Sequence, residues 1–333
     1  MAEWLHEAGI GECRAALVEH DRIVEMAIER DDDPRPRAGA FLDTRLNKRA
    51  DASGRGVVML AGGVVARLQP VPKGLTEGAP LRVEVVREAL PEAGGWKPPV
   101  VRPAAPDALP GDGPDLLARL RAAGHAVRTT TPAAGLLEQA GWSEAMEEAA
   151  SGIVARPQAM LRIALTPAMT LIDVDGATSA AELARAGAGL AGAAIRRFGI
   201  AGSIGIDLPT LPDKAGRLAA AEALDAALPQ PFERTGVNGF GFLQIVRRRE
   251  RPSIMERIAA DPVATAALAL LARAERAGGH GPVTLEGHPQ VIRRLAARPA
   301  WRAALAMRIG AEICLSERPD LPISAGHAIR LPS

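Results

Sequence analysis

The stretch "MTLIDVDG", Met169 to Gly176, ends an apolar run with two aspartates, Asp173 and Asp175, placed two residues apart. Further along the chain, "GSIGIDLP", Gly202 to Pro209, ends a second apolar run with Asp207. Short apolar runs that are bounded by turn residues are typical of buried β-strands. The two stretches therefore predict strands that carry carboxylates at their carboxyl-terminal ends.

The segment between these strands, Ser179 to Gly199, has the apolar spacing of a helix. Two strands joined by a helix are usually parallel neighbours, so Asp173 and Asp207 are expected side by side at the sheet edge where α/β proteins bind ligands. Two carboxylates placed there can bind a hard cation such as Mg²⁺. Asp175 lies two residues beyond Asp173 and is expected on the same face. Taken alone, the spacing also fits aspartates that begin turns after strands, which is the commoner role.

The rest of the chain divides by pattern. Residues 12–85 alternate in short strands around a turn at His20–Asp21 and several glycines, which predicts a hairpin and a small barrel. A proline-rich segment, 94–114, predicts a domain boundary, and the strand–helix alternation after it predicts an α/β layer. Beyond Ile254 the pattern is mostly helical around one strand. The expected domains are residues 1–100, 101–155, 156–260 and 261–333. The glycine-rich residues 186–194 lie within a helical pattern and predict close helix packing, not a nucleotide-binding loop.

Composition limits the partners and the compartment. The net charge of +1 gives no general attraction to nucleic acid, so a polyanion site must be a local patch. The two cysteines, Cys13 and Cys314, are far apart and belong to no Cys/His cluster, so no zinc site is expected and a reducing cytoplasm is favoured. No apolar run approaches the length of about 18 residues that indicates a membrane span. We therefore expect a cytoplasmic protein without membrane contact.

Two basic segments are candidates for phosphate binding. In "VRRRERP", Val246 to Pro252, an extended chain would place Arg247, Arg249 and Arg251 on one face, as a rail for a phosphate backbone. Arg128 stands beside three threonines in "VRTTT", where guanidinium and hydroxyl groups could form a phosphate pocket. Ordinary solvated charges are the commoner explanation for each segment when it is taken alone.

Together these segments resemble the ribonuclease E/G family. The blocks "TPAMTLIDVDG", "IRRFGIAGSIGIDL" and "TGVNGFGFLQIVRRRERPSI" follow the order and spacing of its catalytic domain, and "VRTTTPAAG" is similar to its segment that binds a 5′-phosphate. The resemblance implies a mixed α+β (α/β) fold. It would have an N-terminal RNase H-like layer with an inserted OB-type β-barrel, a DNase I-like α/β catalytic domain and a small C-terminal domain.

The resemblance also implies roles for individual residues. Asp173 and Asp207 would bind Mg²⁺, which Mn²⁺ could replace, and Asp175 would help position the attacking water. Arg128 and Thr129 would bind the 5′-phosphate of the RNA. The expected RNA contacts are Asn238, Arg247, Arg249 and Arg251. The implied activity is endonucleolytic cleavage of single-stranded RNA by metal-activated water, in RNA processing or decay, leaving a 5′-phosphate and a 3′-hydroxyl.

The chain departs from the family pattern at several places. Asp175 stands where the family usually has Asn, Met59 and Leu68 stand where it has stacking Phe residues, and its Cys-x-x-Cys zinc link is missing. A homodimer would therefore form without that link. Two other functions stay open: an RNA-binding protein on the same fold with weak or no catalysis, and a metal-dependent hydrolase of small phosphoesters.

Overall fold

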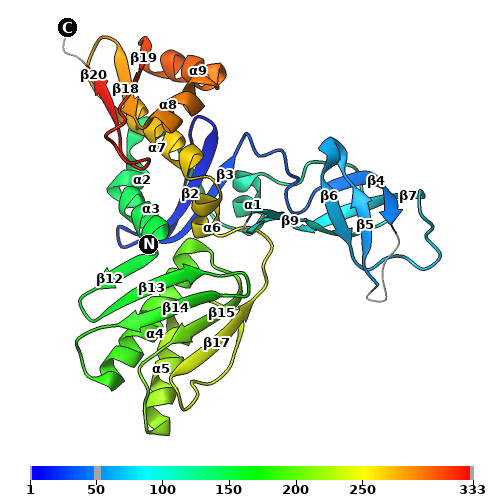
Figure 1. The fold of residues 1–333 in the computed structure, drawn as a ribbon, viewed down its shortest axis with the longest axis vertical. Coiled ribbons are helices and arrows are strands. Elements are labelled where there is room, and N and C mark those ends of the chain that lie inside the picture. Colours follow the sequence, from blue (N-terminus) through cyan, green and yellow to red (C-terminus); the bar gives the residue numbers. More distant parts are fainter. Residues whose placement is uncertain (1, 49–53, 93, 331–333) are drawn as a thin grey trace. The chain divides into compact units, whose positions relative to one another are not determined.

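The computed structural model describes residues 2–48, 54–92 and 94–330 and shows a mixed α+β protein, as expected (Figure 1). The chain forms two compact units. The first consists of Met1–Asp32, Leu120–Ala150 and Arg257–Ser333, and the second of Asp33–Arg119 and Ser151–Glu256. Each unit therefore collects segments that are distant in sequence. No helix in the described part of the chain is long and apolar enough to cross a lipid bilayer.

A four-stranded sheet with the order β11-β1-β2-β3 belongs to the first unit. Its strands are β1 (Glu3–Ala8), β2 (Glu12–Glu19), β3 (Arg22–Arg30) and β11 (Val127–Thr130). β1 is parallel to β11 and antiparallel to β2, which is antiparallel to β3. The expected hairpin is confirmed: His20 and Asp21 have φ values of 49° and 60°, as a tight two-residue turn requires.

Helices and a second sheet complete the first unit. The helices along these segments are α2 (Leu136–Gln139), α3 (Trp142–Ser151), α6 (Ile254–Ala260), α7 (Pro262–Arg276), α8 (Pro289–Ala296) and α9 (Pro299–Ile309), with a short 3₁₀ turn, η2 (Pro132–Ala134). The sheet has the order β19-β18-β20, formed by β18 (Val283–Gly287), β19 (Ile313–Glu317) and β20 (Gly326–Arg330). The sequence pattern predicted only β18, because β19 and β20 are half-exposed and lack a clear alternation.

The hairpin is tied to α7 by two arginines. Arg14 Nη2 donates to the carbonyl oxygen of Leu268 at 3.2 Å, and Arg30 Nη2 donates to Thr265 Oγ1 at 2.7 Å. The first unit therefore joins the beginning of the chain to a helix that follows the second unit in sequence.

A closed barrel with the order β10-β6-β5-β4-β7 forms one part of the second unit. Its strands are β4 (Phe41–Lys48), β5 (Gly56–Met59), β6 (Val65–Leu68), β7 (Pro80–Arg87) and β10 (Val100–Pro103). The same stretch of chain also forms η1 (Ala61–Gly63), the hairpin of β8 (Leu90–Glu92) and β9 (Gly95–Lys97), and α1 (Leu116–Ala122), whose last residues belong to the first unit. The predicted barrel is confirmed, and β10 extends it past residue 100, where the N-terminal region was expected to end. Residues 49–53, within 12–85, lie outside the described part.

The other part of the second unit is a six-stranded sheet with the order β12-β13-β14-β15-β17-β16. Its strands are β12 (Ile153–Arg156), β13 (Ala159–Leu165), β14 (Thr170–Asp175), β15 (Gly202–Asp207), β16 (Glu233–Arg234) and β17 (Phe242–Arg247). β14 and β15 are parallel, and the other neighbours are antiparallel. α4 (Ala180–Phe198) and α5 (Lys214–Ala227) cover one face of this sheet (Figure 1).

Local sequence explains how α4 connects β14 to β15. The Ser179 side chain accepts a hydrogen bond from the backbone N–H of Glu182, and Gly199 ends the helix with a φ of 64°. A side chain at Gly187 would collide with Val174 of the sheet, and one at Gly192 would come within 3.0 Å of the Leu224 carbonyl of α5. The expected close packing of the glycine-rich helix is therefore confirmed.

Candidate functional site

The six-stranded sheet has one face covered by helices and one open face. Along β14, Thr170, Ile172 and Val174 are buried, whereas Leu171 and Asp173 are exposed. Successive side chains of a strand point to opposite faces, so Leu171, Asp173 and Asp175 belong to the open face. The expectation that Asp175 shares a face with Asp173 is confirmed.

Asp173 and Asp207 form a direct pair on this open face. They are register partners on the parallel strands β14 and β15, and both are exposed. Residues paired in this way lie about 4.8 Å apart between backbones, so the two carboxylates can reach the same ion. The predicted meeting of the two aspartates at the carboxyl ends of neighbouring strands is confirmed.

A magnesium ion fits the chemistry of this aspartate pair. Mg²⁺ prefers oxygen ligands, is commonly held by one or two carboxylates, and keeps several waters. Within residues 2–48, 54–92 and 94–330, no group of three or more His, Cys, Asp and Glu side chains is arranged to bind a metal. Because Asp173 and Asp207 are register partners with exposed side chains, they are the residues that would hold the ion, with solvent or substrate supplying the other oxygens.

Asp175 has a partner that the sequence pattern did not indicate. Arg162 of β13 is the register partner of Asp173, and its Nε donates to Asp175 Oδ2 at 3.0 Å. Both side chains are about half exposed. The guanidinium offsets the charge that an aspartate adds here, so the open face carries Arg162, Asp173 and Asp207 in one row across three strands.

The row ends at an aromatic residue. Phe242 of β17 is the register partner of Asp207 and is half-buried. Its ring lies over Gly205, where an added Cβ would come within 2.5 Å of Phe242 Cζ and 3.1 Å of Leu171 Cδ2. Gly205 is therefore needed for the ring to lie on the sheet beside Asp207.

Asn238 shapes the loop before β17. Its Oδ1 accepts hydrogen bonds from the backbone N–H groups of Phe240 at 2.9 Å and Phe242 at 3.0 Å. An asparagine that folds its own chain in this way is a turn-forming residue. The predicted RNA contact through Asn238 stays a prediction, and it would use the side-chain amide nitrogen.

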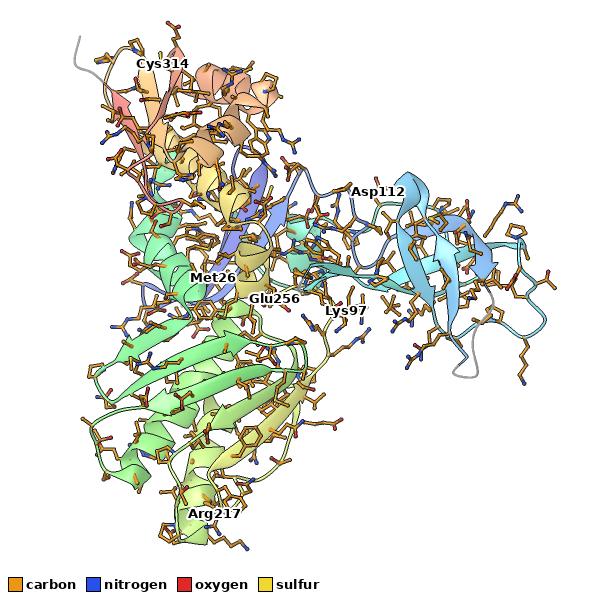
Figure 2. The ribbon with its side chains drawn as sticks, in the orientation of Figure 1. Met26, Lys97, Asp112, Arg217, Glu256 and Cys314 are labelled. Atoms are coloured by element: carbon orange, nitrogen blue, oxygen red, sulfur yellow. The ribbon has the colours of Figure 1, made fainter. Side chains whose placement is uncertain are left out.

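The arginines after β17 do not form the expected extended rail. β17 ends at Arg247, whose Nη1 donates to the Ile200 carbonyl at 2.9 Å. Arg249 is hydrogen-bonded to Glu256, a residue near the start of α6 that is labelled in Figure 2. Arg251 Nε lies 3.1 Å from Glu88 Oε1, and burial together with the nearby Arg119 lowers the pKa of Arg251. Because β17 ends at Arg247, Arg249 and Arg251 do not line one face of a strand. They form ion pairs with Glu256 and Glu88 instead.

The predicted 5′-phosphate residues lie in the first unit, on the edge strand β11. Arg128 and Thr129 are exposed and consecutive, so their side chains point to opposite faces of the strand. Arg128 Nη1 lies 4.0 Å from Glu3 Oε2. The strand alone therefore does not bring the two side chains into one pocket.

The two barrel positions compared with stacking Phe residues differ in exposure. Met59 is 42% exposed, whereas Leu68 is fully buried in the barrel core. The assignment of Leu68 to a base-stacking position is therefore wrong, because the alternation of β6 points its side chain into the core of the barrel.

Arg162 and Phe242 are the residues that sequence reasoning missed. The alternation of "AMLRIAL" could have placed Arg162 on the face opposite Leu161, but only the register of β13 with β14 brings it to Asp175.

Comparison with known proteins adds no family: no family model matches the chain, and no curated protein matches it.

Proposed function

We propose that the chain is a Mg²⁺-dependent endoribonuclease that cleaves single-stranded RNA. The observation that carries the proposal is the register pair of Asp173 and Asp207 on the open face of the six-stranded sheet. A bound Mg²⁺ supplies charge neutralisation at a phosphate and activation of a water. The two aspartates hold the ion, and the guanidinium of Arg162 faces the same space as a donor for phosphate oxygens.

The layout of the sheets supports the same proposal. A closed five-stranded barrel lies in sequence between β3 and β11, two strands of one sheet. We take the barrel as an OB-type RNA-binding module inserted into an RNase H-like layer, and the six-stranded sheet as a DNase I-like catalytic layer. Because their side chains point to opposite faces of β11, the guanidinium of Arg128 and the main chain of Thr129 would then bind the 5′-phosphate of the RNA. Arg247 would contact the RNA backbone.

Cleavage of a 5′-monophosphorylated single-stranded RNA, with Mg²⁺, with Mn²⁺ and with chelator, tests the proposal. The products are expected to carry a 5′-phosphate and a 3′-hydroxyl, and chelator is expected to stop cleavage. Asp173→Asn and Asp207→Asn should each lower the rate by at least about 100-fold, the scale on which removal of a transition-state charge contact acts.

Glu222→Gln is the matched control, because it neutralises an exposed carboxylate on α5, on the covered side of the same sheet. It should cleave at the wild-type rate. Wild-type rates for both aspartate variants would contradict the assignment, and activity on small phosphoesters without activity on RNA would contradict the substrate class.

A further inference from the structure

Phe240 is an exposed aromatic side chain close to the aspartate pair. It is 84% exposed, and the chain has only five Phe and no Tyr. Single exposed apolar residues are normal on protein surfaces, so exposure alone says little. Two further observations point to a ligand: the loop fixes the backbone of Phe240, and the loop adjoins the aspartate pair.

The backbone of Phe240 is held on both sides. Its N–H donates to Asn238 Oδ1 at 2.9 Å, and its carbonyl accepts from Thr210 Oγ1 at 3.3 Å. Gly241 has a φ of 89°, and a side chain there would collide with the Leu208 carbonyl, so only glycine permits this turn. The loop therefore presents the ring from a fixed backbone, which lowers the ordering cost of binding.

The loop also adjoins the candidate metal ligands. Leu208, the residue after Asp207, donates its N–H to the Gly241 carbonyl at 3.1 Å. Phe242, the residue after Gly241, is the register partner of Asp207, and its ring lies on the open face over Gly205. Two of the five Phe residues of the chain thus flank one end of the row that contains Asp173 and Asp207.

We propose that Phe240, together with the Phe242 ring, is a stacking subsite for a nucleobase of single-stranded RNA next to the scissile phosphate. The inference rests on the proposed function, because the aspartate pair defines where the phosphate lies. Aromatic rings bind bases of any sequence through their π-faces, and the chain has few other exposed rings to offer. The subsite places an aromatic contact at the six-stranded sheet, next to the aspartate pair.

The test is an abasic scan in the Asp207→Asn background, which prevents turnover. Oligoribonucleotides that lack one base at successive positions are bound to this protein in Mg²⁺, and each Kd is compared with that of the intact oligonucleotide. One or two adjacent positions should lose about 5- to 150-fold in affinity, the equivalent of about 1–3 kcal/mol of stacking per base. Adding Phe240→Ala should remove this position dependence, and Phe240→Trp should retain it with quenching of the new tryptophan fluorescence.

Met307→Ala is the matched control, because Met307 on α9 is 85% exposed and also apolar. It should leave the scan unchanged. An unchanged scan in Phe240→Ala would overturn the subsite, even if the wild type cleaves RNA. A Phe240-dependent position in a protein that cleaves no RNA would support the subsite and contradict the proposed function. Absence of any RNA binding would overturn both.

Discussion

Arg162 and Asp175 are joined across two antiparallel strands, with Arg162 Nε 3.0 Å from Asp175 Oδ2. The pair lies beside the two aspartates that we assign to Mg²⁺, so it sets the net charge of the site. Without Arg162, three carboxylates would share this part of the open face.

Arg162→Ala is expected to tighten Mg²⁺ binding and slow cleavage at saturating Mg²⁺. The freed Asp175 carboxylate attracts the cation and repels the phosphate. Because both side chains are half exposed, we expect about a two- to fivefold change in the Mg²⁺ Kd, measured by calorimetry. The double variant Arg162→Ala/Asp175→Asn should return towards the wild type in the Mg²⁺ Kd, whereas its cleavage rate should stay low because the guanidinium donor for the phosphate is still missing. Arg185→Ala, an exposed charge removed from α4, serves as control, and additive effects of the two site substitutions would refute the coupling.

Gly205→Ala is expected to destabilise the sheet by about 1–3 kcal/mol, the usual cost of overpacking. The new methyl group would meet Phe242 Cζ at 2.5 Å and push the ring away from its place beside Asp207. Denaturant unfolding measures the loss. Gly236→Ala is the matched control, since nothing lies within 4 Å of its Cβ position, and it should change stability by no more than about 0.5 kcal/mol. Equal stabilities of the two variants would show that the Phe242 ring does not lie over Gly205.

Arg251→Ala is expected to lower stability more than RNA affinity. Glu88, mostly buried, would lose the guanidinium 3.1 Å away, at a cost of about 1–3 kcal/mol in the free energy of unfolding. Arg248→Ala, at a 75% exposed side chain, should cost no more than about 0.5 kcal/mol. If Arg251 instead bound a phosphate, its removal would reduce the slope of log K against log salt by about 0.7, a change that a binding titration would reveal.

Glu7 is expected to make stability depend on pH. Its carboxyl is buried and lies 3.7 Å from Arg14, and neither oxygen has a hydrogen-bond partner in the described part of the chain. Burial raises its pKa above the usual 4.5 against the opposing effect of Arg14 and Arg276. The folded state therefore binds the proton more tightly than the unfolded state. This contribution is fully present below pH 4.5 and is lost as pH rises through the raised pKa.

Unfolding of wild type and Glu7→Gln from pH 4 to pH 8 measures this dependence. The difference in unfolding free energy between the two proteins should shift in favour of Glu7→Gln as pH rises through that window. A difference that stays constant over the whole range would mean that the pKa of Glu7 is the same in the folded and unfolded states.

The aspartate pair could be predicted from sequence because a strand–helix–strand connection leaves few arrangements. Asp173 and Asp207 each end an apolar run, and a right-handed crossover between parallel neighbours brings such ends together. The Arg162–Asp175 pair depends instead on the register of β13 and β14, fixed by the turn in which the Thr166 hydroxyl and Met169 bond each other. A shift of one residue would move Arg162 to the other face, and composition does not determine that register.

The end of β17 did carry a sequence signal. Ser253 and Glu256 form a reciprocal capping box, with Ser253 N–H donating to Glu256 Oε2 at 2.8 Å and Glu256 N–H donating to Ser253 Oγ at 3.2 Å. A helix that begins there, after Pro252, leaves little room for a strand to continue through Arg249 and Arg251. The ion pair of Arg251 could not be predicted, because Glu88 is distant in sequence and meets Arg251 only in the fold.

The two hydrogen bonds from the first hairpin to α7 have a consequence for biosynthesis. Arg14 leaves the ribosome 254 residues before the Leu268 carbonyl that it binds, which at about 5–20 residues per second is a delay of roughly 13–50 s. The barrel and the six-stranded sheet are complete before α7 is made, so they can fold during translation. Until α7 is made, the hairpin of β2 and β3 lacks the helix to which Arg14 and Arg30 bind. A nascent chain halted before α7 should therefore resist proteolysis in the two segments of the second unit, Asp33–Arg119 and Ser151–Glu256, and be cut in residues 1–32.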